Sequence, residues 1–142
     1  MALPTPRPPF VLDADCIIKL ARQGLLRSLP SDERTIIIPF KVDEEIRGYR
    51  GRRSLVKEWL NKNNHLVKRF QTPEEHELYY ALIAARGHVL GEGEAAGIAM
   101  ANRRNGTFVS DDRKAREIAS LRHIVSITPA EFHQFVLPRL GM

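Results

Sequence analysis

The sequence contains a single cysteine and no long hydrophobic run, and both absences narrow the classes of protein that fit it. With Cys16 alone, the 142-residue chain can form neither an internal disulfide framework nor a zinc site built from several cysteines. No uninterrupted apolar stretch approaches the roughly 18 residues that a membrane-spanning helix needs. Residues 1–9 contain four prolines and lack the apolar segment of a secretory signal. We therefore expect a cytoplasmic protein without a membrane partner, with Cys16 as a small core residue.

Aromatic residues are also few, at 7% of the chain, but 43% apolar and 27% charged residues are near the averages of globular proteins. These fractions exclude disordered and collagen-like classes. The length predicts one domain over residues 1–142, with residues 1–8 as a proline-rich lead. The formal net charge of +5 is compatible with a polyanionic partner but does not establish one.

Short apolar runs alternate with segments of helical character along the chain. The predicted strands cover residues 9–13, 35–39, 65–70, 107–111 and 123–127. The predicted helices cover residues 16–22, 42–46, 54–60, 92–103 and 112–120, with two more beginning near 73 and 128. Because the first two runs are apolar throughout, they indicate strands buried on both faces. The alternation predicts an α/β fold with a doubly wound parallel sheet of about five strands.

Acidic residues stand where two of these strands end. Asp13 and Asp15 follow the first strand, and Asp111 and Asp112 follow the fourth. Ligands of such sheets bind beyond the carboxyl ends of the strands. Clustered carboxylates repel one another unless a hard cation such as Mg²⁺ or Mn²⁺ neutralises them. The alternative is that each acid caps the helix that follows, which explains one acid per strand end but not two.

Two further acidic segments lie near predicted helix starts. Residues 43–45 read Asp-Glu-Glu, shortly after the second strand. Glu94 begins an alanine-rich helix whose small residues allow close approach to a neighbouring strand; its alternative interpretation is an ordinary first-turn glutamate. The string Gly-Glu-Gly-Glu at 91–94 lacks the Lys-Ser/Thr of a P-loop and carries the wrong charge for phosphate.

Four segments together resemble PIN-domain nucleases, in particular toxin ribonucleases of the VapC type. They are residues 11–18, 39–46, 91–99 and 108–116, in the order of that family. The resemblance implies a three-layer α/β/α sandwich with an acidic pocket that binds Mg²⁺ or Mn²⁺ and cleaves RNA. The catalytic carboxylates that it implies are Asp13, Glu45, Glu94 and Asp111. The metal ligands that it implies are Asp13, Glu94, Asp111 and Asp112.

Two positions stay open within this resemblance. Glu44 is an alternative to Glu45 if the register differs by one residue, and Asp15 stands where the family more often has serine or asparagine. Asp15 is therefore either a ligand or a helix cap. Many relatives are the toxin of a toxin–antitoxin pair and form homodimers, which implies an antitoxin partner and a homodimer here.

The expected chemistry needs no side-chain nucleophile, because metal ions can activate water, neutralise the phosphate and stabilise the leaving oxygen. The five histidines are scattered and are interpreted as structural or solvent-exposed. RNA would be held by a glycine-punctuated segment in which arginines grip phosphates and a tyrosine stacks on a base. That segment supplies Arg47, Tyr49, Arg50, Arg52 and Arg53. Its alternative interpretation is a solvated loop.

Other basic residues flank the acidic segments and are candidates for the same role: Arg103, Arg104, Arg113, Lys114 and Arg116. Leu78, Tyr79, Leu82 and Ile83 form an apolar stripe expected to be core first and dimer surface second.

Two other functions compete with the nuclease. The Asp13-Ala14-Asp15 motif resembles that of haloacid-dehalogenase-type phosphatases. Those enzymes need serine or threonine at the end of the second strand, where Pro39 and Phe40 stand, and they give Glu45 and Glu94 no role. The third hypothesis is a catalytically inactive module that binds RNA or a protein. Tight Mn²⁺ uptake would distinguish an enzyme from such a module.

Overall fold

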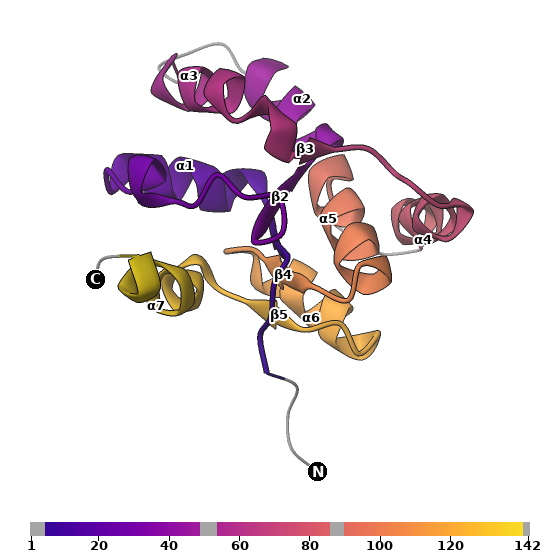
Figure 1. Ribbon diagram of the computed structural model, residues 1–142. Helices are drawn as coiled ribbons and strands as arrows, with labels where there is room; N and C mark the ends of the chain where they lie inside the picture. The colour runs from indigo at the N-terminus through magenta and orange to yellow at the C-terminus, as the bar shows by residue number, and fades with distance from the viewer. Residues whose placement is uncertain (1–4, 49–53, 86–89, 141–142) are drawn as a thin grey trace.

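The computed structural model describes residues 5–48, 54–85 and 90–140, and its strands form one sheet in the order β3-β2-β1-β4-β5 (Figure 1). The strands are β1 (Phe10–Leu12), β2 (Ile36–Pro39), β3 (Val67–Lys68), β4 (Thr107–Val109) and β5 (Ser126–Ile127). All four neighbouring pairs are parallel, so the carboxyl ends of the strands share one edge. The predicted α/β fold with a five-stranded parallel sheet is confirmed.

Helices cover both faces of the sheet and complete three layers (Figure 1). The helices are α1 (Ala14–Arg22), α2 (Phe40–Gly48), α3 (Ser54–Lys62), α4 (Pro73–Ala84), α5 (Glu92–Arg103), α6 (Arg113–Leu121) and α7 (Pro129–Leu140). One core joins the sheet to α1, α2, α3 and α7, and a second core joins it to α4, α5 and α6. The sandwich that the family resemblance implies is therefore present.

The alternation of side chains along β1 explains why every residue of so short a strand is apolar. Phe10 and Leu12 pack into the core beneath α1 and α7, whereas Val11 points to the opposite core beneath α5. All three are at most 5% exposed. Successive residues of a strand point to opposite faces, so a strand covered on both sides needs an apolar residue at each position.

Two predicted strands are reduced to two residues each in the structure, and the other three are shorter by one or two residues. Residues 64–66 form a turn of 3₁₀ helix, and only Val67 and Lys68 pair with β2. The fifth strand begins at Ser126 because His123 adopts a left-handed backbone conformation, with φ of 62°, that ends the turn after α6. The predictions of strand at 65–66, 69–70 and 123–125 were wrong for these reasons.

Close packing of α5 against β4 depends on Gly97. A Cβ atom at this position would lie 2.7 Å from Cε1 of the buried Phe108 ring and 3.8 Å from Val11. Carbon atoms do not approach so closely, so the helix could keep its place only if the ring moved. This contact confirms that small residues bring the alanine-rich helix against its strand.

We expect the Gly97→Ala substitution to lower the free energy of unfolding by up to about 2 kcal/mol. Alanine favours a helix by about 1 kcal/mol over glycine, but overpacking a core commonly costs about 1–3 kcal/mol. Gly48 is the matched control, because a Cβ there meets nothing within 4 Å. Urea denaturation of both variants measures the difference. Equal stability of Gly97→Ala and Gly48→Ala would contradict the packing argument.

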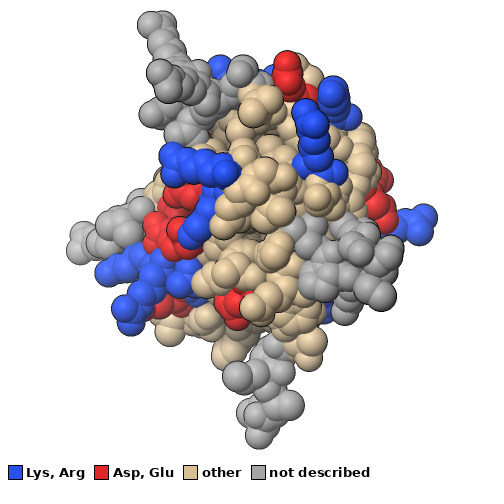
Figure 2. Space-filling model, turned by 90° about the vertical axis from the view of Figure 1, so that its left-hand side faces the viewer, with Lys and Arg blue, Asp and Glu red and all other residues tan. Residues whose placement is uncertain are grey.

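Figure 2 shows the side of the molecule where α1, α3 and α7 lie. Its middle is largely uncharged, and acidic and basic side chains lie together at its left edge, with others at the upper right and the right edge. The net positive charge of the chain therefore does not form a single basic field on this side. Within residues 5–48, 54–85 and 90–140, no helix is long and apolar enough to cross a bilayer.

Candidate active site

Asp13 lies at the centre of the carboxyl edge of the sheet, directly after β1. Its Oδ1 accepts a hydrogen bond from the Ala14 backbone amide at 2.7 Å, and its Oδ2 accepts one from Ser110 Oγ at 2.7 Å. Leu12 of β1 pairs with Val109 of β4, so the residues that follow them, Asp13 and Ser110, lie next to each other. Asp13 is therefore the N-cap of α1, as one interpretation of the sequence held, and it also faces the end of β4.

Ser110 is a site residue that the sequence analysis missed. It is fully buried, and besides donating to Asp13 it accepts a hydrogen bond from the Asp112 backbone amide at 3.0 Å. Its carbonyl oxygen accepts one from Arg116 Nη1 at 2.8 Å. The available signal was a hydroxyl residue between a buried strand and two acids, because such a residue can link the strand end to its carboxylates.

Burial raises the pKa of Asp13 from 3.8 to about 6. The hydrogen bonds from Ser110 and Ala14 favour the charged form and oppose this rise, whereas the nearby charges of Asp15 and Glu45 add to it. The side chain is 4% exposed. Asp13 is thus a buried acid whose neighbours include other acids, which is the electrostatic setting that a bound cation would relieve.

Glu94 is the third residue of α5 and belongs to the same cluster. Its Oε1 accepts a hydrogen bond from the Gly91 backbone amide at 2.9 Å, so it acts in part as the first-turn residue of the alternative interpretation. Partial burial raises its pKa from 4.5 to about 8, and the charges of Asp13 and Asp112 contribute. A first-turn glutamate with no further role would have its negative form favoured by the helix dipole. The pKa of Glu94 is instead raised, so its neutral form is favoured.

Asp112 is the N-cap of α6 and accepts hydrogen bonds from the backbone amides of Lys114 and Ala115, at 2.8 and 3.1 Å. Burial acts to raise its pKa, but the bonds from Ala115, Glu94 and Lys114 outweigh it and hold the pKa below its usual value. The pKa values of Glu94 and Asp112 therefore shift in opposite directions because the two carboxyl groups are neighbours, and Asp112 is the one favoured in its charged form.

We expect the stability of the metal-free protein to fall as the pH rises from about 4.5 to about 8. A carboxyl group whose pKa is raised by folding stabilises the folded state while protonated, and this contribution is lost as Glu94 ionises. Glu94→Gln removes the ionisation and keeps an oxygen for Gly91. Because Glu94 is half-buried, solvent screens part of the effect, and we expect a gain of about 1–2 kcal/mol at pH 8 and none at pH 4.

Urea denaturation in EDTA at both pH values measures this gain. Glu77→Gln, which removes an exposed acid on α4, is the matched control. A stability curve for the wild type that runs parallel to that of Glu94→Gln would contradict the assignment.

Glu45 and its neighbour Glu44 point in different directions from α2. Glu44 forms an ion pair with Lys41 at 3.9 Å and is exposed. Glu45 lies against the start of α5, where a Cβ on Gly93 would be 3.7 Å from its Oε1. Partial burial raises the pKa of Glu45, and the charges of Asp15 and Glu92 add to the rise. Of the two open alternatives, the structure brings Glu45 towards Asp13.

Asp111 sits at the outer rim of the cluster. Its side chain is 47% exposed, and its Oδ2 is 3.3 Å from Lys19 Nζ on α1. Asp15, also on α1, is exposed; Asp13, not Asp15, caps this helix. Lys19 is a cation within the acidic cluster that the sequence analysis did not select, because the contact joins residues 92 positions apart.

Of the RNA-binding residues predicted at positions 47–53, the structure describes Arg47 alone. Tyr49, Arg50, Arg52 and Arg53 lie outside the described residues. Arg47 Nε binds Asp43 at 2.9 Å and its Nη1 binds Asn61 at 2.8 Å, so its guanidinium links α2 to α3.

Among the flanking basic residues, Arg104 forms an ion pair with the buried Glu75 at 2.8 Å. Its guanidinium is engaged in this pair, and its suggested role in binding RNA stays a prediction. Arg113 pairs with Glu117 at 3.2 Å within α6. Cys16 is fully buried, as predicted, and burial raises the pKa of its thiol.

The acidic cluster, which comprises Asp13, Glu45, Glu94, Asp111 and Asp112, has the donor chemistry of a divalent-cation site. In the described part of the chain, no three acidic, histidine or cysteine side chains stand close enough to hold an ion as they are placed. Burial and mutual repulsion nevertheless keep protons on two of these carboxyl groups at pH values above their usual range. A hard cation would lower the cost of ionising these groups, so the donor chemistry of the residues fits one.

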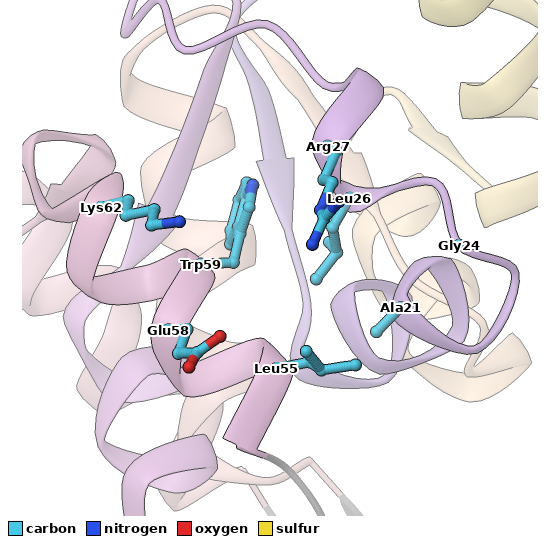
Figure 3. Close-up of a pocket in the computed structure, with 8 residues that line it drawn as sticks. All are labelled: Ala21, Gly24, Leu26, Arg27, Leu55, Glu58, Trp59 and Lys62. Atoms are coloured by element: carbon cyan, nitrogen blue, oxygen red, sulfur yellow. The ribbon is translucent and has the colours of Figure 1, made fainter.

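A separate hollow of about 330 Å³ lies between α1, the turn after it and α3 (Figure 3). Trp59 and Leu55 of α3 face Leu26 and Ala21 across it, with Arg27 and other charged side chains at its rim. None of the acids of the cluster lines this hollow. It is distinct from the carboxyl edge of the sheet.

The protein is a three-layer α/β/α sandwich with carboxylates at the carboxyl edge of its sheet. Comparison with known families identifies the family to which it belongs. Residues 9–127 match the model of the family DUF3368, described as a PIN domain. The chain belongs to this family of PIN domains, whose members are typically nucleases that use divalent metals. Comparison with curated proteins gives no match.

Solved structures of similar fold cover most of the chain at low sequence identity. FitAcB from Neisseria gonorrhoeae matches with a TM-score of 0.60 and 14% identity, over 85% of this chain and 98% of that chain. PAE2754 from Pyrobaculum aerophilum gives 0.56 and 17%, over 93% and 96%. VapBC2 from Rickettsia felis, bound to a DNA fragment from their promoter, gives 0.53 and 13%, over 84% and 97%. These matches establish the shared fold.

Proposed function

We propose that this PIN domain is a metal-dependent endoribonuclease that hydrolyses RNA phosphodiester bonds with Mg²⁺ or Mn²⁺. One observation carries the proposal. Asp13, Glu94 and Asp112, which belong to three different elements, lie close enough at the carboxyl edge of the sheet for their charges to interact. If these acids served only as helix caps, nothing would require their negative charges to lie close together. Membership in the PIN family supports nuclease chemistry for this cluster.

The residues take different parts in this reaction. A bound ion would supply a water of lowered pKa and neutralise the phosphate. Asp13, Glu94, Asp111 and Asp112 would hold the ion, with Ser110 fixing the carboxylate of Asp13 through its hydroxyl.

Glu45, across the cluster on α2, would orient the attacking water, because its carboxylate is not engaged as a helix cap. Lys19, which pairs with Asp111, would offer a positive charge to a phosphate bound there. No covalent intermediate on the protein is required.

We further propose that the chain works as the toxin of a toxin–antitoxin pair, with an antitoxin protein as partner and a homodimer as its assembly. The likeness of its fold to VapBC2 and to FitAcB supports the first part. The phosphatase hypothesis has no support left, because the family match assigns the chain to PIN domains. An inactive binding module remains the second candidate, and the raised pKa values of Asp13 and Glu94 argue against it.

The test is cleavage of a labelled RNA pool by the purified protein with Mn²⁺ and with EDTA. We expect cleavage only with Mn²⁺, and a rise in the melting temperature when Mn²⁺ is added, because an ion that binds only the folded state stabilises it. No cleavage together with no Mn²⁺-induced stabilisation would favour the inactive module.

A further inference from the structure

A row of aromatic rings lies beside the acidic cluster, at the carboxyl ends of β2 and β3. Phe40 follows β2 directly and Phe70 follows β3, and their rings meet edge to face with centroids 5.1 Å apart. Phe70 also contacts Tyr79 and His76 of α4, at 5.1 and 5.2 Å. The row therefore runs without a gap from the end of the sheet to the surface of α4.

The outer end of this row is open to solvent. His76 and Tyr80, one helical turn apart on α4, are stacked with centroids 5.0 Å apart and an interplanar angle of 12°. Tyr80 is 59% exposed, one of the most exposed large apolar side chains in the described residues. The core does not require a tyrosine here, since Tyr79 and Leu82 already cover the inner face of the helix. The stacked pair thus offers a flat π-surface to a ligand.

Cationic side chains accompany the rings. The Arg69 guanidinium lies over the Phe40 ring, with Cζ 5.3 Å from its centroid, and Lys41 Nζ lies 5.4 Å from the same centroid. Lys41 is engaged by Glu44 and Glu92, each at 3.9 Å. Arg69 is exposed, and among the described residues its guanidinium is in no ion pair. Arg69 is therefore available to bind a phosphate or to stack on a base.

The sheet places this surface beside the acidic cluster. The register pairs Pro39 with Lys68, so the residues that follow them, Phe40 and Arg69, leave the sheet at one edge. Asp13 leaves β1 at the same edge, and β2 is the only strand between β1 and β3. Neighbouring strands are about 4.8 Å apart, so β3 ends about 10 Å from β1. A few nucleotides of an extended single strand span the distance between these two strand ends.

Hydrogen bonds to largely buried side chains hold the backbone of residues 69–71 in place. Arg104 Nη2 donates to the Arg69 carbonyl oxygen at 2.9 Å, and the backbone amide of Gln71 donates to Glu75 Oε1 at 2.6 Å. Glu75 is 1% exposed and is ion-paired with Arg104. A buried ion pair thus fixes the backbone on either side of Phe70. Such anchoring prepares the exposed groups for binding without an ordering cost on association.

We propose that Arg69, His76 and Tyr80 form a stacking platform that holds unpaired bases of single-stranded RNA next to the acidic cluster. This inference rests on the proposed ribonuclease function and names the residues that would hold the bases of its substrate. Aromatic side chains and arginine stack on any base, but only on bases that are not paired within a duplex. Arg69 and the continuity with the cluster favour RNA over a protein partner.

The experiment measures binding in EDTA, so that no cleavage occurs. The probe is a short fluorescein-labelled oligoadenylate, alone and paired with its complement, and the readout is fluorescence anisotropy. We expect Tyr80→Ala to weaken binding of the single strand by about tenfold, since one stacked base contributes about 1–3 kcal/mol. Tyr80→Phe keeps the ring and should stay within about twofold of the wild type. Leu121→Ala, which removes an 81% exposed side chain of α6, is the control.

Three outcomes would overturn the platform. Tyr80→Ala that binds the single strand as tightly as Leu121→Ala would show that the ring makes no contact, and wild-type protein that prefers the duplex would exclude stacking. If size-exclusion chromatography shows that Tyr80→Ala turns a dimer into a monomer, the surface joins two copies of the chain instead. In each case, Mn²⁺-dependent cleavage by the wild type would leave the proposed nuclease intact. A wild type that neither binds nor cleaves RNA would remove both.

Discussion

The Asp13→Asn variant should lose Mn²⁺-dependent RNA cleavage by about a thousandfold or more while its fold becomes more stable. Activity falls because a neutral amide is a poor ligand for a hard cation, and residues that act as one catalytic unit are not replaceable singly. The fold survives because the asparagine oxygen can still accept from the Ala14 amide and its amide group can still donate to Ser110.

The gain in stability follows from the raised pKa of Asp13. Burial holds that pKa at about 6, against 3.8 for the unfolded chain, so ionisation at neutral pH opposes folding. A raised pKa means that the contribution is intact below about pH 4 and lost as the pH passes 6. Two pKa units correspond to about 3 kcal/mol, and we expect Asp13→Asn to recover about 2–3 kcal/mol at pH 7 in EDTA. At pH 4 the variant and the wild type should be equally stable.

Urea denaturation at the two pH values and a cleavage assay on the same preparations test both halves of this prediction. Glu44→Gln is the matched control, because it removes an exposed acid of α2 that pairs with Lys41 and faces away from the cluster. The control should cleave RNA within a few-fold of the wild type. If Asp13→Asn instead unfolds at lower urea concentrations, Asp13 serves chiefly as the N-cap of α1, and the catalytic assignment loses its basis.

Much of the fold could be predicted because it depends on local pattern. An apolar residue at every position of 10–12 and 36–38 indicates strands covered on both faces, and both strands lie in the middle of the sheet. The capping box at the start of α7 is present, with Thr128 and Glu131 bonded reciprocally at 3.0 and 3.1 Å. The weak, half-polar run at 65–70 failed because β3 is an edge strand that pairs with β2 over two residues only.

The candidate site was partly predictable for a related reason. Parallel strands bring their carboxyl ends to one edge, so acids that follow β1 and β4 must meet there, whatever their separation in the chain. Contacts made by long side chains follow no such rule. The ion pair of Lys19 with Asp111 depends on where α1 lies against the end of β4, and no spacing in the sequence reports that. For the same reason, no spacing in the sequence indicates that Arg104, which flanks an acidic segment, pairs with Glu75 of α4.

Arg104→Ala should lower the free energy of unfolding by about 3 kcal/mol or more. The guanidinium binds Glu75 through Nε at 2.8 Å and the Arg69 carbonyl through Nη2 at 2.9 Å. Its removal leaves the Glu75 carboxylate, 1% exposed, without a charge partner, and breaking a buried ion pair in this way typically costs about 3–5 kcal/mol. Urea denaturation measures the loss, with the exposed neighbour Arg103→Ala as the control, expected within about 0.5 kcal/mol of the wild type.

A second variant separates the charge from the packing. Glu75→Gln together with Arg104→Met removes both charges and keeps most of the side-chain volume, so it should recover much of the loss, because no buried charge is then unpaired. The double variant would also release the carbonyl of Arg69 from its donor and loosen the segment that carries the stacking platform. Weaker binding of single-stranded RNA at near-normal stability is therefore expected of it. Equal stability of Arg104→Ala and Arg103→Ala would show that solvent reaches Glu75 and that the pair anchors nothing.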